Sequence, residues 1–384
     1  MVSTRNLSAI CLTRQQMDMG SNFEKYLQRY VFPCLCLLGI IGNCLNLTVL
    51  LNKRMRSRSN TFLALLAVSD CIFLSLLLPN ILANIPFFTY NYYFRLFYFY
   101  SKVHLLAFAN WSSGVAIWSV IAVSSERLIG IKRPLYCRSH VPSYKIRLIL
   151  FALVVFPFIL TGYQHFAHVC LVRKNYCGST QVFALCLSTT QDRWINNSSN
   201  PYDMSFRRFI RVSKLINVVF VIIVPIVLLT ILNMCLLGYL RKRSENLQMS
   251  DEMSAKPCVD KQKYLRTEQR VSFTVTLIVT LFTLTNGPSA VDQLLQMAYP
   301  TPQPMLWYDI SLLISTLVII GKSSNFIVFC LFSKSFRNRL FSLAQKKVHE
   351  KFESRRKSSF MPKASLAGRK ETTGSKMSSN ERSL

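Results

Sequence analysis

Seven long apolar segments constrain the fold of this chain of 384 residues more than any other feature. A bilayer core about 30 Å thick requires about 20 apolar residues of helix, because lipid offers no hydrogen bonds and a spanning segment must satisfy its own backbone. The sequence therefore predicts an all-α membrane protein with a seven-transmembrane helix bundle. The predicted spans cover approximately residues 30–51, 62–88, 103–125, 147–168, 213–240, 271–297 and 306–332.

The apolar segments also divide the chain into four parts. Residues 1–29 contain no apolar core, which predicts an extracellular N-terminus without a cleavable signal peptide, so that the first span acts as the insertion signal. Residues 30–332 form the predicted seven-transmembrane domain. Residues 333–357 resemble an amphipathic helix on the cytoplasmic membrane surface. Residues 358–384 are polar and basic, and we expect a disordered cytoplasmic tail there.

Lysine and arginine set the predicted orientation. With the N-terminus outside, the cytoplasmic segments carry 31 basic residues and the extracellular segments carry 13. The positive-inside rule therefore predicts a multi-pass plasma-membrane protein with an extracellular N-terminus and a cytoplasmic C-terminus. The net charge of +29 is spread over loops that flank membrane spans, which favours contacts with anionic membrane lipids and argues against nucleic acid as a partner.

Glycosylation sequons agree with this orientation. Asn6, Asn196 and Asn197 begin sequons in segments that are predicted to be extracellular. The sequons at Asn46 and Asn110 lie inside spans, where glycosylation does not reach. We therefore expect a glycoprotein modified at the first three positions.

Cysteines and catalytic motifs are informative by their placement. No metal-binding or nucleophile motif, such as CxxC, HExxH, GxSxG or a P-loop, is present, so we expect no enzyme, no metal and no cofactor. Four thiols on the predicted outer side permit three disulfide pairings, between which the sequence does not choose. These cysteines are Cys11, Cys170, Cys177 and Cys186.

Polar residues and prolines at membrane depth are costly and are therefore functional candidates. One such landmark occurs in nearly every span and in the same order as in a known family. The chain resembles a rhodopsin-like (class A) G-protein-coupled receptor. The landmarks are Gly42-Asn43, Leu66-Ala67-Val68-Ser69-Asp70, Glu126-Arg127, Pro225, Phe282 with Pro288, Asn325, and Phe336-Arg337.

Several landmarks depart from the common pattern of that family. The third span ends in Glu126-Arg127-Leu128, and Lys102 stands at the outer end of that span where most members have a Cys, so we expect no disulfide from it to the second outer loop. The departures are similar to those of invertebrate FMRFamide-type neuropeptide receptors. The segments that carry this likeness are Glu268-Gln269-Arg270-Val271, Asn286-Gly287-Pro288 and Ser324-Asn325-Phe326.

The resemblance implies a switch at the cytoplasmic end. Arg127 and Glu268 stand where the family places a charged pair that holds the sixth span closed, and such a pair is worth roughly 1.5 to 3 kcal/mol. Agonist binding then breaks the pair, the sixth span moves about the Pro288 kink, and Arg127 contacts a heterotrimeric G protein. The alternative is that both charges only reach toward the membrane surface.

Lys322 is the least expected residue, because a lone lysine at the bilayer centre costs about 2.5 to 3.5 kcal/mol. We expect it to pair with Asp70. In the family this Asp often binds sodium, together with a Ser of the third span and an Asn of the seventh. This chain has Ala116 and Gly321 at those two positions. We therefore predict that the Lys322 ammonium group replaces the sodium ion. The alternatives are a lysine directed elsewhere or, as in opsins, a retinal Schiff base; the opsin lysine position is Ile319 here.

The outer halves of the spans indicate the ligand. Ala109 stands where amine receptors have an Asp, which argues against a biogenic amine. Carboxylates for a guanidinium group, aromatic walls and amide side chains suit a short amidated peptide that ends in Arg-Phe. The alternatives are an interfacial aromatic belt without a binding role, a non-peptide ligand, or a membrane transporter. The candidate ligand-binding residues are Asn110, Asp292, Gln293, Gln296, Trp307, Tyr308 and Asp309.

Two further segments have predicted roles. Segment 169–212 is long enough to fold over the bundle as a lid. The tail carries serine and threonine among basic residues, and phosphorylation there adds charge that is able to recruit an arrestin; plain disorder is the alternative. These tail positions are Ser358, Ser359, Ser365, Thr372, Thr373, Ser375, Ser378 and Ser379.

Overall fold

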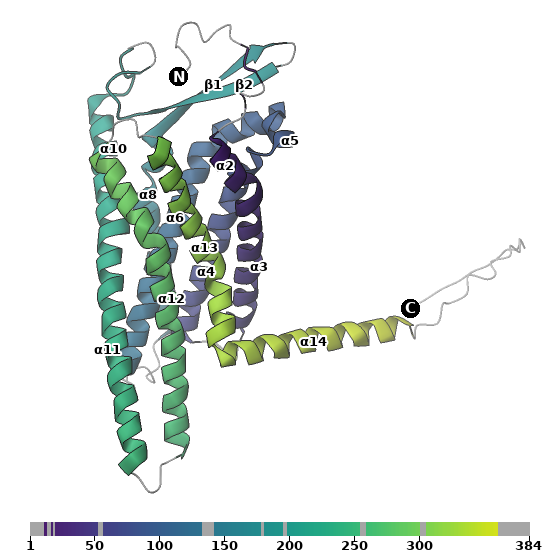
Figure 1. Ribbon diagram of the computed structural model, residues 1–384, viewed down its shortest axis with the longest axis vertical. Helices are drawn as coiled ribbons and strands as arrows, with labels where there is room; N and C mark the ends of the chain where they lie inside the picture. Colours follow the sequence, from purple (N-terminus) through teal and green to yellow (C-terminus); the bar gives the residue numbers. More distant parts are fainter. Residues whose placement is uncertain are drawn as a thin grey trace, which may run out of the picture. The chain divides into compact units, whose positions relative to one another are not determined.

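A computed structural model confirms the predicted bundle, because seven of its described helices are long and apolar enough to cross a membrane (Figure 1). The chain divides into two compact units, Met1–Arg337 and Asn338–Leu384. The described residues are 11–13, 17, 20–52, 57–132, 142–177, 180–194, 198–253, 259–299 and 305–359, without the side chains of 243–253, 259–271 and a few scattered positions.

Two of the spans contain a π-helical turn between helical pieces. The first joins α2 (Asn22–Tyr26) through a π-helical turn (Leu27–Val31) to α3 (Phe32–Leu50). The fifth joins α10 (Met204–Asn217) through a second π-helical turn (Val218–Ile223) to α11 (Val224–Met253). The other long helices are α4 (Arg58–Leu82), α6 (Tyr92–Lys132), α8 (Ser143–Thr161), α12 (Val259–Ala298) and α13 (Met305–Phe332).

The helices form a closed ring in which each contacts its neighbours. α3 packs against α4 and α13, α4 against α6, α6 against α8 and α11, and α12 bridges α11 and α13. Glycine permits the closest crossings, as is usual between membrane helices. A Cβ atom on Gly42 would lie 2.8 Å from the Cβ of Phe326, and one on Gly321 would lie 2.2 Å from the Thr285 hydroxyl.

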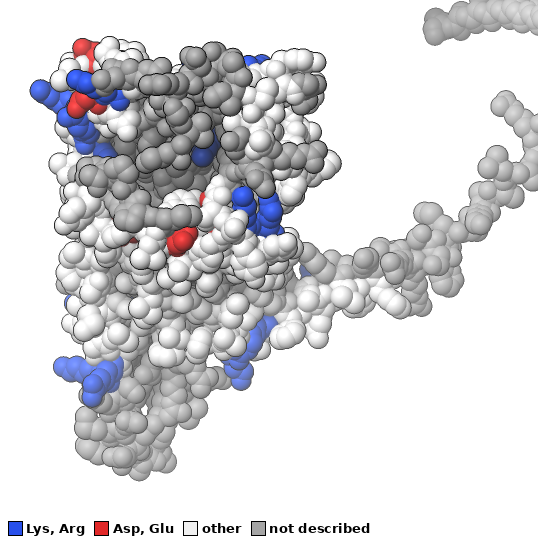
Figure 2. Space-filling model, turned by 45° about the horizontal axis from the view of Figure 1, so that its top comes forward, with Lys and Arg blue, Asp and Glu red and all other residues white. Residues whose placement is uncertain are grey.

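α3 exposes apolar side chains on its outer face and buries a polar side chain inside the bundle. On α3 the side chains of Leu37 and Leu38 are 61% and 64% exposed, whereas Asn43 is fully buried. This distribution is the reverse of a soluble protein and suits lipid contact. In the tilted view of Figure 2, the described charged residues gather toward the two ends of the bundle, and mostly uncharged residues lie between them.

An antiparallel hairpin crosses the N-terminal end of the bundle (Figure 1). Its strands are β1 (His168–Tyr176) and β2 (Thr180–Ser188), and Cys170 lies directly opposite Cys186 in the register. Disulfides join Cys170 to Cys186 and Cys11 to Cys177, which selects one of the three predicted pairings. Neither disulfide joins the hairpin to α6, as the lysine at position 102 led us to expect.

Arg95 at the start of α6 joins three segments at this end. The side chain is buried and donates to the carbonyl oxygens of Val182, Met17 and Thr89, the last two at 3.1 Å. The guanidinium group also lies 5.1 Å from the centre of the Phe99 ring. These bonds fix the hairpin, the N-terminal segment and the short helix α5 (Pro86–Thr89) to one helix end.

The chain ends its described part in α14 (Lys334–Ser359), which overlaps the predicted amphipathic helix. Phe336 at its start is buried against Phe326 and Phe329 of α13. Arg337 donates to the carbonyl oxygens of Cys330 and Leu331 at 2.8 and 2.7 Å, which satisfies the last turn of α13. The predicted tail beyond residue 359 lies outside the described residues.

Candidate functional site

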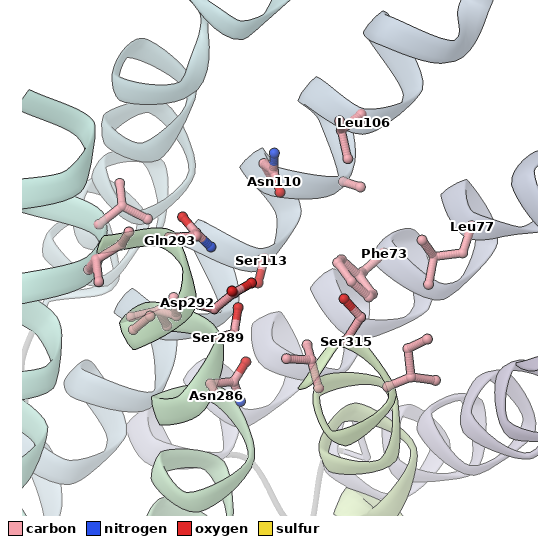
Figure 3. Close-up of a pocket in the computed structure, with 18 of the residues that line it drawn as sticks. Phe73, Leu77, Leu106, Asn110, Ser113, Asn286, Ser289, Asp292, Gln293 and Ser315 are labelled. Atoms are coloured by element: carbon pink, nitrogen blue, oxygen red, sulfur yellow. The ribbon is translucent and has the colours of Figure 1, made fainter. Parts of the chain in front are cut away.

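A cavity of about 700 Å³ lies inside the bundle, in the half toward the hairpin. Its walls come from all seven spans, and its size is within the range of small-molecule and peptide-end binding sites. Figure 3 shows polar side chains from α6, α12 and α13 gathered around the cavity, with Leu77 and Phe73 of α4 on the apolar side. The polar residues labelled there are Asn110, Ser113, Asn286, Ser289, Asp292, Gln293 and Ser315.

Asp292 is the buried acid of this cavity, with 9% of its surface exposed. Its two carboxylate oxygens accept from neutral donors, the Ser311 hydroxyl and the Gln296 amide, each at 2.9 Å. No lysine or arginine of the described chain pairs with it. A carboxylate that is oriented by two hydrogen bonds but lacks a positive partner suits a cationic ligand group.

Five of the seven predicted ligand-binding residues line the cavity: Asn110, Asp292, Gln293, Gln296 and Tyr308. The described lining leaves out Trp307 and Asp309. Helix geometry explains the difference, because consecutive residues point about 100° apart. Tyr308, Leu312 and Ser315 share the inward face of α13, and the residues on either side of Tyr308 are turned away from it.

The cavity also contains residues that the sequence did not single out as ligand contacts. Glu24 accepts a hydrogen bond from the Tyr308 hydroxyl. Gln28 is 3% exposed, and its side-chain oxygen has no hydrogen-bond partner in the described part of the chain. Lys102, where the family pattern has a Cys, also lines the wall. No sequence signal placed the first two residues in the bundle, because they precede the predicted first span.

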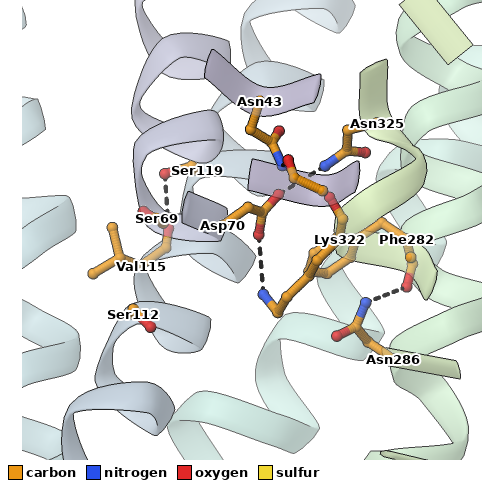
Figure 4. A network of polar contacts seen from close by, with 12 residues as sticks. Asn43, Ser69, Asp70, Ser112, Val115, Ser119, Phe282, Asn286, Lys322 and Asn325 are labelled. Carbon is orange, nitrogen blue, oxygen red and sulfur yellow. Dashed lines mark hydrogen bonds and ion pairs between the residues drawn. The ribbon is translucent and has the colours of Figure 1, made fainter. Parts of the chain in front are cut away.

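Below the cavity, Lys322 and Asp70 form the expected ion pair (Figure 4). The Lys322 ammonium nitrogen lies 3.1 Å from one carboxylate oxygen of Asp70, and the side chains are 1% and 0% exposed. The Asn325 amide donates to the other oxygen at 2.8 Å. Asn43 donates to the backbone carbonyl of Lys322 at 3.0 Å and thereby fixes α13 to α3. The predicted contact is confirmed, whereas its role in switching stays a prediction.

Lys322 is separated from the ligand cavity by Phe73. The described lining does not include this lysine, and its ammonium nitrogen lies 4.6 Å from the centre of the Phe73 ring, which itself lines the cavity. A ligand in the cavity therefore contacts Phe73 rather than the amine. This arrangement opposes a retinal Schiff base, in which the lysine nitrogen is bonded to the ligand.

Asn286 and Pro288 lie in α12 beside the cavity. The Asn286 amide donates to the Phe282 carbonyl at 2.9 Å, and Pro288 stands inside the helix. A proline inside a helix removes one backbone hydrogen bond and permits a kink. The local chemistry is compatible with the predicted pivot, which stays a prediction.

The far end of the bundle contains an ion pair that the sequence did not predict. Glu126 pairs with Arg58 at the start of α4, with a nitrogen–oxygen distance of 3.3 Å. Arg127 beside it is partly buried. The side chain of Glu268, its predicted partner, lies outside the described residues. The Arg127–Glu268 lock therefore stays a prediction, and the ion pair of Glu126 was not anticipated from the sequence.

The predicted glycosylation sites also fall outside what the structure describes. Asn6, Asn196 and Asn197 belong to segments that are not described. Asn110, by contrast, lies within α6, where its amide donates to the Gln164 side chain at 2.6 Å. Its location in a span agrees with the expectation that this sequon is not modified.

Comparison with known proteins identifies the family. The pattern of the serpentine type 7TM GPCR chemoreceptor Srw family matches residues 30–347. The chain belongs to this family. It is 38% identical to a putative G-protein coupled receptor of Caenorhabditis elegans over 88% of this chain and 78% of that one. It is 26% identical to a probable G-protein coupled receptor of the same organism over 80% of this chain and 67% of that one.

A third relative is the cholecystokinin receptor type A of Rattus norvegicus, which is 31% identical over 44% of this chain and 37% of that receptor. The chain is thus a multi-pass membrane receptor that couples an extracellular ligand to a G protein, and this family is not enzymatic. The sequence suggested a likeness to FMRFamide-type receptors in particular. The family description is broader, because it supports a serpentine chemoreceptor family and does not specify FMRFamide-type receptors.

Proposed function

We propose that this receptor binds the amidated end of an extracellular, FMRFamide-like neuropeptide and signals through a heterotrimeric G protein. The proposal includes a location in the plasma membrane, with the N-terminus and the hairpin outside and α14 with the tail in the cytoplasm. The excess of basic residues on the predicted cytoplasmic segments supports this orientation.

The observation that carries the proposal is the carboxylate of Asp292. It is buried in the cavity, oriented by Ser311 and Gln296, and lacks a cation from the described chain. A guanidinium group from a ligand supplies that missing charge and forms two parallel hydrogen bonds with a carboxylate. An arginine next to the peptide end therefore fits this acid better than a neutral ligand does.

The remaining lining suits the rest of such a peptide end. Phe73, Tyr98 and Phe282 offer aromatic surface to a phenylalanine ring, and amide side chains such as Asn110 and Gln293 offer partners to a terminal carboxamide. The partial likeness to receptors named for cholecystokinin adds support. The family description as chemoreceptors favours a second candidate, a small external chemical with a cationic group, which the same carboxylate would bind.

The switch that we propose has two parts. The Lys322 ammonium group acts as a built-in cation for Asp70 and, with Asn43 and Asn325, links α3, α4 and α13 at the level below the ligand. At the cytoplasmic end, Arg127 and Glu268 hold α12 until the ligand moves it about Asn286 and Pro288. A few kcal/mol separate such conformations, which is the scale of one partly buried charged pair.

The other predicted features belong to the same proposal. Residues 1–29 and the sequons at Asn6, Asn196 and Asn197 form the glycosylated outer part, and residues 30–332 form the membrane domain. Residues 333–357 lie on the inner membrane surface, and phosphorylation within 358–384 recruits an arrestin. Each of these statements rests on the sequence patterns above.

A panel of synthetic peptides tests the proposal in cells that express the chain. We expect G-protein activation by amidated peptides that end in Arg-Phe. Replacing the arginine with the neutral analogue citrulline is expected to lower potency about 10- to 150-fold, the loss of one charge-assisted contact. Cells without the chain are the control. Activation by neutral peptides as strongly as by arginine peptides, or by small amines alone, would contradict the peptide assignment.

A further inference from the structure

Two histidines from different elements meet beside the hairpin. His104 of α6 and His165 of α9 (Gln164–Ala167) direct their Nδ1 atoms at each other across 3.0 Å. The ring centres are 5.2 Å apart, with planes inclined by 30°. His104 is exposed and His165 is half-buried.

Both rings are held in place by their surroundings. His104 projects from a continuous helix, and Phe108, one turn further along α6, packs its ring edgewise on His165 with centres 4.8 Å apart. The backbone of α9 is fixed by the Thr189 hydroxyl, which donates to the carbonyl oxygens of Phe166 and Ala167 at 3.1 Å. The two nitrogens therefore face each other on preorganised elements.

The facing nitrogens match the geometry of a metal chelate. Two imidazole nitrogens bound to one ion at about 2.0 to 2.1 Å lie about 2.8 to 3.4 Å apart when the angle at the metal is between about 90° and 110°. The observed separation of 3.0 Å falls in this range. Without a metal, the pair holds together only when one Nδ1 carries a proton and the other does not.

We propose that His104 and His165 bind a divalent transition-metal ion, and zinc is the ion with which the site is tested. Each ring coordinates through Nδ1 and carries a proton on Nε2. The described chain offers no group of three or more metal-ligating residues, so water completes the coordination. Imidazole selects transition metals over calcium and magnesium.

The site has a structural consequence for access to the cavity. His165 lies three residues before the start of β1, and neither disulfide joins the hairpin to α6. A metal bound by both histidines links α6 to the stem of the hairpin. Binding is therefore expected to slow amide hydrogen exchange in β1 and β2.

Zinc titration of the purified full-length receptor tests the site. The receptor is purified through an affinity tag that contains no histidine. We expect one zinc ion per chain with a Kd of about 1 to 100 µM, the range for half the ligands of a structural zinc site. His104→Gln and His165→Gln are each expected to weaken binding at least tenfold. His168→Gln, which changes a histidine three residues away in the sequence, is the matched control and is expected to bind normally.

A rescue variant separates coordination from folding. His104→Cys supplies a thiolate, which is also a zinc ligand, and is expected to retain binding. Magnesium at the same concentration is expected to have no effect. Equal zinc binding by the receptor and by the double glutamine variant would overturn the proposal, as would an equal loss in His168→Gln or an absence of binding below millimolar zinc.

Discussion

The buried pair of Lys322 and Asp70 offers the sharpest test of the energetics in this bundle. Both side chains are essentially unexposed and meet at 3.1 Å. Removing one partner of a buried ion pair leaves an uncompensated charge and typically costs about 3 to 5 kcal/mol, whereas replacing both with neutral groups is often nearly neutral. We therefore expect Lys322→Met or Asp70→Asn alone to lose about 3 to 5 kcal/mol of unfolding free energy, and the double variant to lose much less.

Unfolding in detergent is measurable through the protein's own thiols. Cys36 is fully buried in α3, so its reaction with a fluorogenic maleimide, followed at that residue by peptide mapping, reports opening of the bundle. A loss below about 1 kcal/mol in both single variants would refute the reasoning. So would additive losses in the double variant, because they would show no coupling between the two charges.

The same variants test whether the ammonium group takes the place of a sodium ion. In Lys322→Met the carboxylate of Asp70 keeps Asn325 as a donor but loses its cation. We expect millimolar sodium, but not the larger potassium ion, to stabilise this variant and to leave the unmodified receptor unchanged. A clear sodium effect on the unmodified receptor would contradict the built-in cation.

Three further outcomes are expected at the hairpin end. Arg95→Met leaves three carbonyl oxygens without their donor and should lower the unfolding free energy by about 1 to 3 kcal/mol per group left buried; unchanged thermal unfolding would contradict this. Cys11→Ser should free the N-terminal segment, giving faster protease cleavage before residue 20, and Cys177→Ser should match it. Burial and the nearby Lys214 ammonium group hold the pKa of His168 below its ordinary value. As the pH falls, His168 therefore takes up a proton in the unfolded chain before it does so in the folded chain. The unfolding free energy should be highest above about pH 6.5 and should fall as the pH drops toward the pKa of the folded state. Thermal unfolding at several pH values measures this dependence, and His168→Gln should remove it.

The sequence predicted those features that follow from the cost of polar groups in lipid. The seven spans follow from hydrophobic length alone. The partner of Lys322 followed because a buried ammonium group requires an acid at the same depth, and Asp70 was the available candidate. The absence of a disulfide from α6 to the hairpin followed from Lys102, since a lysine forms no such bond.

Other features depended on geometry that the sequence does not contain. The rotation of α13 about its own axis decides that Tyr308 lines the cavity and that Trp307 and Asp309 do not. The sequence before the helix does not determine this rotation. The hairpin register required pairing of strands across a turn and a choice among three disulfide patterns. The ion pair of Glu126 with Arg58 joins two helix ends whose relative height emerges only from packing.

Asp292 remains the centre of the functional proposal, and one matched pair of variants tests it most directly. The measurement is guanine-nucleotide exchange by heterotrimeric G protein on the purified receptor, driven by an amidated peptide ending in Arg-Phe. We expect Asp292→Asn to raise the half-maximal peptide concentration about 10- to 150-fold, while Asp309→Asn, which changes a carboxylate outside the described cavity lining, leaves it unchanged. An unchanged response in Asp292→Asn, or an equal loss in both variants, would contradict the account.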